Sequence, residues 1–433
     1  MSVENKKEKS LGYTLVPNKT RYIVLTSFSL VFLLIGILSD SFSNILSGLY
    51  KIIIEPDILI TDYFEVGGIG AAFVNSGLLM LISVLILFIL KVEITGITIA
   101  SVFLMGSFAL FGKNIVNVWP IILGVYLYSK VCKEKFADHI YAAFFSTSIS
   151  PIVTELLFVS NYPLWIRIIK TLVIGISIGF CVPPVSKHLF HVHKGFSLYN
   201  TGFAVGIIGT VFVSFFKSIG YDPRNRLLWS SGNDVYLGTW LIIIFTCLFI
   251  AGYFLSGKSL ENLKNIFTYS GQLSSDFVAL EGFGSVLMNM GLNGFLAMAY
   301  VLIVGGPLNG PTIGGILTVV GFGSFGKHCR NIFPIFLGVL LGGILNLWEL
   351  NNPSILLAAL FGTSLAPIAG RFGFIWGIVA VIINSAVVLN LSVLHGGMNL
   401  YNTGFSAGIV SAFMVPILNT FYEKNIVSKN NLI

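Results

Sequence analysis

Apolar stretches of about twenty residues recur along nearly the whole chain, for example at 22–38, 71–90 and 236–255. A helix needs about 20 mostly apolar residues to cross the hydrocarbon core of a bilayer. Only 10% of the 433 residues are charged and 55% are hydrophobic, whereas a soluble domain has roughly 25% charged residues. The sequence therefore predicts an all-α polytopic membrane protein with the lipid bilayer as a partner, and it excludes a soluble fold.

The chain contains an internal repeat. A shift of 214 positions superimposes residues 62–125 on residues 276–339 without a gap. The matched positions include rare polar residues and prolines rather than interchangeable Leu and Ile, so chance does not explain the run. The match continues with small changes of offset, and both halves end in the motif HxGxxLYNTGFxxGI. We predict a basic cytoplasmic tail over 1–20, a first membrane repeat over 21–234 and a second over 235–433.

Each half contains about seven hydrophobic segments. In the first half they lie at 21–39, 69–90, 95–111, 117–131, 138–158, 164–182 and 198–217. An odd number of crossings inserts the second half upside down. With the basic tail inside, the Lys-rich loops at 130–135 and 187–194 fall inside, and their second-half counterparts have no Lys or Arg. The basic segments 327–330 and 424–429 also fall inside. The basic loop at 217–226 would lie outside and disagrees with this arrangement. We predict two inverted repeats with about 12–14 spans, some broken or re-entrant.

The distribution of charge and cysteine excludes several classes of function. The formal charge of +7 comes from Lys and Arg that are scattered through short loops, so no nucleic-acid partner is predicted. The four cysteines have no CxxC spacing, so neither a metal site nor a disulfide framework is indicated. The Phe-Gly-Lys turns lack the spacing of a phosphate-binding loop, and no cofactor is predicted. The first segment is long enough to be an uncleaved span, and we expect both termini on the cytoplasmic side of the cell membrane.

Gly- and Pro-interrupted segments at matching places in two repeats indicate broken helices around a cavity. We predict such breaks at Pro120, Pro334, Pro307 and Pro311. They include the matched pair Pro120 and Pro334, and two prolines of the Gly-rich segment 305–311. These breaks are the best indication of a solute path.

Two lysines occupy matched Phe-Gly-Lys turns, Lys113 in the first half and Lys327 in the second. If these turns lie inside the protein, the ammonium groups favour an anion or a carbonyl oxygen. The alternative is a pair of interfacial lysines whose side chains extend to water.

Further matched polar residues suggest a path. Asn75 and Asn289 stand alone in apolar segments, where an amide either bridges two helices or binds a solute. The two Tyr-Asn-Thr-Gly copies either line the path or form polar caps at the membrane interface. The predicted path residues are Asn75, Asn289, Lys113, Lys327, Asn117, Asn331, Tyr199, Asn200, Thr201, Tyr401, Asn402 and Thr403.

Two matched histidines, His193 and His395, precede the Tyr-Asn-Thr-Gly copies. They are either proton relays or hydrogen-bonded interfacial residues. Asp62 and Asp276 are also matched, and each is either a proton or cation site or the cap of a following helix.

The whole chain resembles a bacterial family of polytopic membrane proteins of unknown function, a resemblance that implies a membrane location and no substrate. A weaker likeness is to urea channels, because 73–75 and 110–114 look like their Asn-Pro element and their aromatic-Gly-x-Asn turn. Here Ser76 and Met290 stand in place of Pro, and His328 stands in place of Asn. The segment count is similar to that of seven-plus-seven inverted-repeat transporters. None of these likenesses identifies the solute.

The sequence thus predicts a membrane transporter or channel for a small-molecule or ion solute, with its path between the repeats and without ATP hydrolysis. The alternative is a membrane-embedded enzyme that acts on a lipid or lipid-linked substrate, with the histidines or lysines as acid and base. Duplicated polar motifs favour a path, because catalytic sites are usually asymmetric, and no catalytic residue is predicted. Whether the chain forms a homo-oligomer stays open.

Overall fold

The computed structural model describes residues 13–159, 161–221 and 226–430. Over these residues the regular structure is helical, and β pairing is limited to two isolated bridges, Thr61 with Leu228 and Asp276 with Phe325. The prediction of an all-α fold is confirmed. Residues 1–12 of the predicted basic tail lie outside the described residues.

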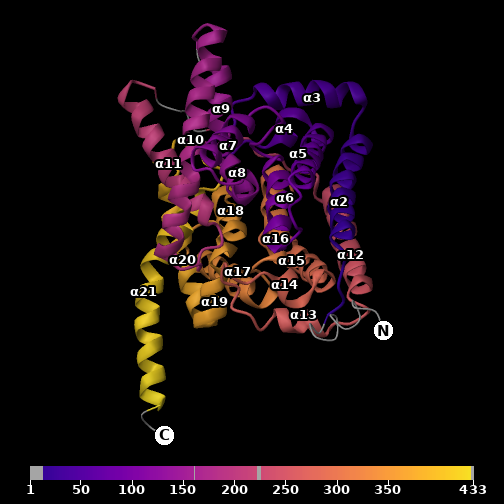
Figure 1. The fold of residues 1–433 in the computed structure, drawn as a ribbon, viewed down its shortest axis with the longest axis vertical. Helices are drawn as coiled ribbons and strands as arrows, with labels where there is room; N and C mark the ends of the chain where they lie inside the picture. The colour runs from indigo at the N-terminus through magenta and orange to yellow at the C-terminus, as the bar shows by residue number, and fades with distance from the viewer. Residues whose placement is uncertain (1–12, 160, 222–225, 431–433) are drawn as a thin grey trace.

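Most helices of the first half have a counterpart in the same order in the second half (Figure 1). The first half contains α2 (Asn18–Ser39), α3 (Phe42–Ile54), α4 (Tyr63–Gly67), α5 (Ile69–Ile89), α6 (Gly96–Phe108), α7 (Trp119–Val131), α8 (Ile140–Ser146), α9 (Pro151–Thr154), α10 (Leu164–His193) and α11 (Asn200–Ser218). The second half contains α12 (Asp234–Leu255), α13 (Glu261–Ile266), α14 (Phe277–Glu281), α15 (Phe283–Ile303), α16 (Gly310–Gly321), α17 (Cys329–Ile344), α18 (Pro353–Gly362), α19 (Ala366–Phe372), α20 (Phe374–Leu391) and α21 (Asn402–Asn430). The central helices α5 and α15 have 21 residues each.

In the described part of the chain, nine helices are long and apolar enough to cross a membrane. They are α2, α5, α10, α11, α12, α15, the continuous pair α18 and α19, α20, and α21. A tenth is added if the two pieces of the segment around α8 and α9, which meet at 54°, form one broken span. The chain is therefore a multi-pass membrane protein.

Four of the predicted hydrophobic segments form short helices. α6 and α7 have 13 residues each, α16 has 12 and α17 has 16. At about 1.5 Å per residue such helices do not cover the roughly 30 Å hydrocarbon core. Together with the long helices they account for seven hydrophobic segments in each half, and the segments predicted at 95–111 and 117–131 are the short ones.

Helix α3 has no counterpart of similar length in the second half, where the six-residue α13 takes its place. One side of α3 is exposed and apolar, with Phe42, Leu46 and Tyr50 at helical spacing, while Ile45 and Ile52 are buried. In Figure 1 α3 lies across the upper edge of the molecule. An amphipathic helix of this kind suits the lipid headgroup region, and it was not predicted from the sequence.

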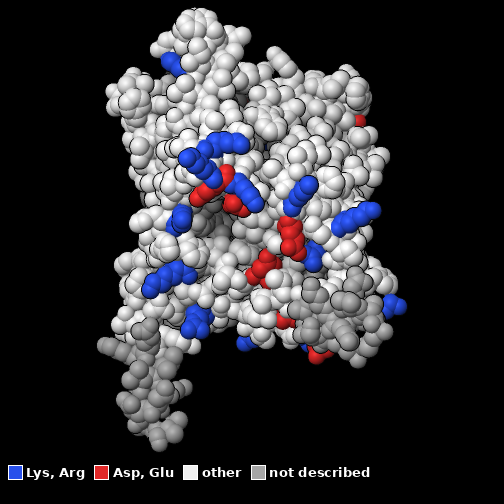
Figure 2. Space-filling model, in the orientation of Figure 1, with Lys and Arg blue, Asp and Glu red and all other residues white. Residues whose placement is uncertain are grey.

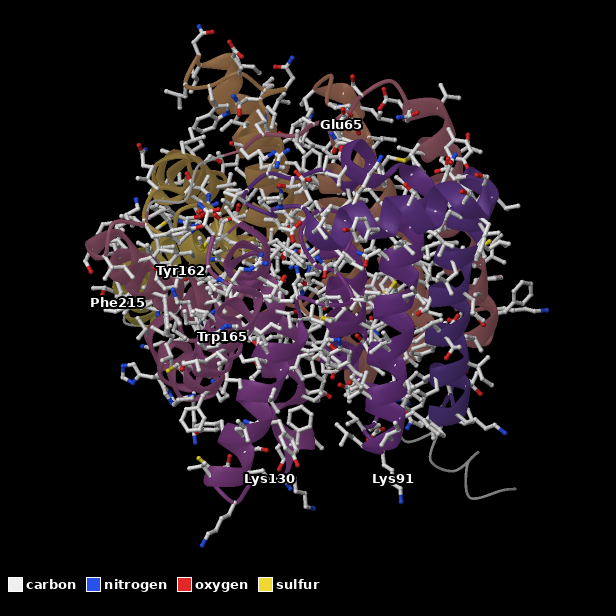
Figure 3. All side chains as sticks on the ribbon, turned by 90° about the horizontal axis from the view of Figure 1, so that it is seen from above. Glu65, Lys91, Lys130, Tyr162, Trp165 and Phe215 are labelled. Atoms are coloured by element: carbon white, nitrogen blue, oxygen red, sulfur yellow. The ribbon has the colours of Figure 1, made fainter. Side chains whose placement is uncertain are left out.

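The direction of α5 and α7 follows from labelled residues in Figure 3. Glu65, in α4 just before α5, and Lys91, just after α5, lie toward opposite edges of the molecule. Lys130, in the last turn of α7, lies at the same edge as Lys91. Because α5 and α7 end on the same face, the chain between them, which contains α6, returns toward the interior from that face.

The short helices α6 and α16 pack against each other near the centre of the molecule (Figure 1). Asp276, the N-cap of α14, accepts hydrogen bonds from Gly96 N at the start of α6 (3.0 and 3.1 Å). Asp62, the N-cap of α4, accepts one from Gly310 N at the start of α16 (3.1 Å). Each half thus caps the short helix of the other.

Candidate functional site

The site begins where α6 and α16 end inside the protein. The last carbonyl groups of a helix have no partner within it, and hydrocarbon offers none. Asn75 of α5 donates to Ala109 O (2.7 Å) and Lys113 O (2.8 Å). In the second half Asn289 of α15 makes the equivalent bonds to Gly323 O (2.7 Å) and Lys327 O (2.8 Å). These two amides hold the Phe-Gly-Lys turns against α5 and α15.

The side chains of both turn lysines are fully buried. Lys327 Nζ donates to the Tyr199 hydroxyl (2.6 Å) and to Thr363 Oγ1 (2.7 Å), and it lies over the rings of Tyr199 and Phe322. Lys113 Nζ has weaker contacts, to Phe144 O (3.4 Å) and a methionine sulfur. Neither ammonium group reaches water at a membrane surface, so the interfacial alternative does not hold.

The Tyr-Asn-Thr-Gly copies meet at the interface between the halves. Helices α11 and α21 begin inside these motifs and pack against each other. The rings of Tyr199 and Tyr401 lie 4.8 Å apart. A side chain at Gly202 would meet Tyr401 at 3.1 Å, and one at Gly404 would meet Tyr199 at 3.2 Å. The small glycines let the two tyrosines approach the partner helix.

A cavity of about 450 Å³ reaches this tyrosine pair. Its lining comes from both halves and includes Ile97, Tyr141, Tyr199, Thr201, Asp276 and Tyr401. Burial raises the pKa of the Asp276 carboxyl, although the bond from Gly96 N lowers it. The cavity therefore runs from the start of α6 and α14 to the centre of the molecule.

The position around Asp62, which corresponds to the cavity position around Asp276, is covered by the segment that connects the two halves. Ile60 N donates to Arg226 O, and Leu228 N donates to Ile60 O (2.9 Å each). Asp62, the counterpart of the cavity residue Asp276, accepts from Ser230 N (3.0 Å) and Ser230 Oγ (2.5 Å). The two halves are thus alike in sequence but differ in what covers their inner surfaces.

Family comparison fits this picture of two halves. The sequence profile of a family described as "Protein of unknown function (DUF1576)" matches residues 41–218 and 255–420, which is most of the chain. The chain belongs to the DUF1576 family. No curated protein and no solved structure matches it. The membership agrees with the resemblance to a membrane protein family of unknown function, and the two matched ranges of this DUF1576 chain begin 214 residues apart.

In this DUF1576 protein the predicted path residues fall into two groups. Tyr199, Asn200, Thr201 and Tyr401 line the cavity, and Lys327 lies directly behind Tyr199. The remaining predicted residues do not line it, and most of them hold structural contacts. They are Asn75, Asn289, Lys113, Asn117, Asn331, Asn402 and Thr403.

The histidines pair with the motif asparagines. His193 Nε2 lies 2.8 Å from Asn200 Oδ1, and His395 Nε2 lies 2.9 Å from Asn402 Oδ1. Each asparagine also donates to a carbonyl of the preceding long helix, Ser186 O or Val388 O. These contacts tie α10 to α11 and α20 to α21. A role in proton transfer stays a prediction.

Only one of the four predicted break prolines lies inside a helix. Pro334 is in α17, whereas Pro120 and Pro311 lie in the first turns of α7 and α16, and Pro307 precedes α16. A proline in a first turn costs no hydrogen bond. The breaks therefore occur between helices rather than at bends within them.

Two buried polar residues, Thr363 and Asp57, were not predicted from the sequence. Thr363, an acceptor for Lys327, belongs to the repeated Thr-Ser-x-x-Pro-Ile motif, so its match to Thr147 was the available signal. Asp57 gave no repeat signal, because its counterpart by the 214-residue shift is Gly271. The structure buries it completely.

Asp57 accepts hydrogen bonds from three neutral groups. They are the Tyr63 hydroxyl (2.7 Å), Thr154 Oγ1 (2.8 Å) and Asn117 Nδ2 (3.1 Å). Burial holds the pKa of the Asp57 carboxyl well above its usual value, although the bonds from Tyr63 and Thr154 lower it. Among the described residues no group of three or more His, Cys, Asp and Glu could hold a metal ion.

Proposed function

We propose that the chain is a transporter or channel for a small polar solute, with a path between its two halves and without ATP hydrolysis. The observation that carries the proposal is the cavity of about 450 Å³ that is lined by both halves and ends at Tyr199 and Tyr401. Pockets of this size between repeats are typical of solute sites in transporters. A purely structural membrane protein has no need of such a polar-ended cavity in its core.

Inverted repeats are part of the proposal. The start of α16 contacts Asp62, which is near Glu65, whereas α6 starts shortly after Lys91, and Glu65 and Lys91 lie toward opposite edges in Figure 3. This supports entry of the corresponding helices from opposite faces. Matched bonds from Asn75 and Asn289 support the same relation. In inverted-repeat transporters the solute site lies where the two repeats meet, among short or broken helices. The cavity has this position.

The orientation in the membrane is proposed from charge. Figure 2 shows the face that forms the lower edge of Figure 3, where Lys91 and Lys130 lie, and Lys, Arg, Asp and Glu gather in its middle and lower part. Loops rich in Lys and Arg tend to stay in the cytoplasm. We assign this face to the cytoplasm, with both termini on that side of the cell membrane. The cavity then faces the cytoplasm, because α6 starts from this face.

The experiment is solute flux into proteoliposomes that contain the purified protein. A panel of neutral, anionic and cationic small solutes is compared for wild type and for Ala142→Trp, which places a large ring in the cavity lining. The control is Ala251→Trp, at an exposed position of α12 outside the cavity. We expect flux that Ala142→Trp abolishes and Ala251→Trp leaves unchanged.

Two results would contradict the proposal. One is equal flux in both tryptophan variants, which would remove the cavity from the path. The other is no flux of any solute together with turnover of a membrane lipid by the purified protein. That second result would assign the chain to the alternative class, a membrane-embedded enzyme.

A further inference from the structure

We propose that the centre of the molecule binds a small monovalent anion, a carboxylate or an oxyanion such as nitrate, between Lys327 and the Tyr401 hydroxyl. The inference rests on the proposed function, because it names the class of solute that the cavity takes. It comes from two independent observations, a buried lysine without a countercharge and a set of buried donors without acceptors.

The first observation concerns charge. Lys327 is fully buried, and both of its hydrogen-bond acceptors, Tyr199 and Thr363, are neutral hydroxyls. None of the ion pairs among the described residues includes Lys327 or Lys113. A charged group inside a membrane protein costs several kcal/mol unless a partner compensates it. An anion in the cavity would supply that partner.

The second observation concerns donors. Tyr401 is 1% exposed and lines the cavity, and its hydroxyl has no hydrogen-bond partner. The hydroxyls of Ser197 and Ser364 and the amide nitrogen of Asn399 are likewise buried and unpartnered. Buried polar groups are normally bonded. All four can donate, so an acceptor ligand is able to satisfy each of them.

Short connections link these groups to the tyrosine pair. Ser197 is two residues before Tyr199, and Leu198 N between them donates to Ser364 O (3.0 Å). Asn399 is likewise two residues before Tyr401. The rings of Tyr199 and Tyr401 are 4.8 Å apart and connect the two sets. The lysine contacts the Tyr199 hydroxyl, and the Tyr401 ring packs on the Tyr199 ring at the inner end of the cavity.

The same contacts argue against a cation. The carboxylate of the cavity lining, Asp276, already accepts from Gly96 N, Val278 N and Ala279 N at the start of α6 and α14. A cation at the inner end would lie beside the Lys327 ammonium group, which contacts Tyr199, and like charges repel in a low-dielectric interior. Charge-assisted bonds from such donors to an anion are stronger than bonds to a neutral carbonyl.

The test is thermal unfolding of the purified full-length protein in neutral detergent, with pairs of probes of similar shape but different charge. The pairs are acetate with acetamide, formate with formamide, and nitrate with urea, at matched ionic strength. We expect at least one anion to raise the unfolding temperature saturably and above its neutral partner. Lys327→Met should abolish that shift, and the exposed-surface control Lys258→Met should leave it unchanged.

Tyr401→Phe keeps the test decisive if Lys327→Met does not fold. The variant removes only a hydroxyl that has no partner, so folding should be unaffected. Loss of one hydrogen bond to an anion should raise the half-saturating concentration at least about tenfold. Binding to Tyr401→Phe as tight as to wild type, or equal stabilisation by each anion and its neutral partner, would overturn the inference.

Failure of this inference differs from failure of the proposed function. Flux of a neutral solute without stabilisation by any anion would retain the path and remove the anion site. Stabilisation by an anion that Tyr401→Phe weakens, without flux of any solute, would retain the site and remove the transport function.

Discussion

Replacing Asn75 by leucine removes the two hydrogen bonds that hold the first Phe-Gly-Lys turn, to Ala109 O and Lys113 O. Asn289→Leu removes the two equivalent bonds in the second half. The costs should nevertheless differ. In the second half Asn293 also donates to Lys327 O (3.1 Å), whereas the matching residue in the first half is Leu79.

The magnitudes follow from the number of carbonyl groups left without a donor. A buried polar group that loses its partner costs about 1–3 kcal/mol. Asn75→Leu leaves two such carbonyls and should lower the free energy of unfolding by about 2–6 kcal/mol. Asn289→Leu leaves one, Gly323 O, because Asn293 keeps its bond to Lys327 O, and it should cost about 1–3 kcal/mol.

The assay is equilibrium unfolding of the purified variants in mixed micelles, followed by helical circular dichroism. Adding Asn293→Leu to Asn289→Leu should raise the cost to that of Asn75→Leu. Leu79→Asn places an amide at the matching position of the first half. Added to Asn75→Leu, it should restore part of the stability that Asn75→Leu loses. Equal costs for the two single variants, or no added cost from Asn293→Leu, would refute this reasoning.

Two further predictions concern packing and buried charge. Gly206→Ala should lower the free energy of unfolding by about 1–3 kcal/mol, because its Cβ would lie 2.2 Å from the Phe405 ring. Gly238→Ala, whose Cβ would meet its nearest neighbour at 3.4 Å, should cost nothing in the same unfolding measurement. Equal costs for the two glycine variants would contradict the close contact between α11 and α21. Asp57→Asn should stabilise the protein more at pH 8 than at pH 5. The raised pKa keeps the folded carboxyl protonated where the unfolded chain has released its proton, so wild-type stability falls as the pH rises. The difference in unfolding free energy between Asp57→Asn and wild type, measured from pH 5 to pH 8, should grow with pH. A constant difference would contradict a raised pKa of the Asp57 carboxyl.

Burial of the turn lysines illustrates what sequence patterns do not contain. The repeat identified Lys113 and Lys327 as matched residues, but an apolar neighbourhood in sequence is the same for a helix that faces lipid and for one that faces another helix. Lipid tails are as apolar as leucine, so hydrophobic periodicity does not separate the two surfaces. Only packing between the halves showed that the Lys327 ammonium contacts Tyr199, 128 positions earlier in the chain.

Asp57 and α3 were missed for related reasons. Asp57 has Gly271 at the repeated position, so comparison of the halves hides it. Its burial depends on Asn117 and Thr154, which come from two other segments. Helix α3 is too short for a span, and its apolar face appears only when residues four apart are compared.

The sequence by itself determined that the chain is a helical multi-pass membrane protein with about seven hydrophobic segments in each half, because hydrocarbon requires every backbone group to bond within its own helix. It also supplied the matched asparagine, lysine and tyrosine residues. The tertiary structure decided which of them meet. Residues 226–230 cover one inner surface, while the other opens into the cavity that reaches Tyr199 and Tyr401. The two halves have nearly identical motifs but differently covered inner surfaces, because residues of the other half surround each copy of a motif.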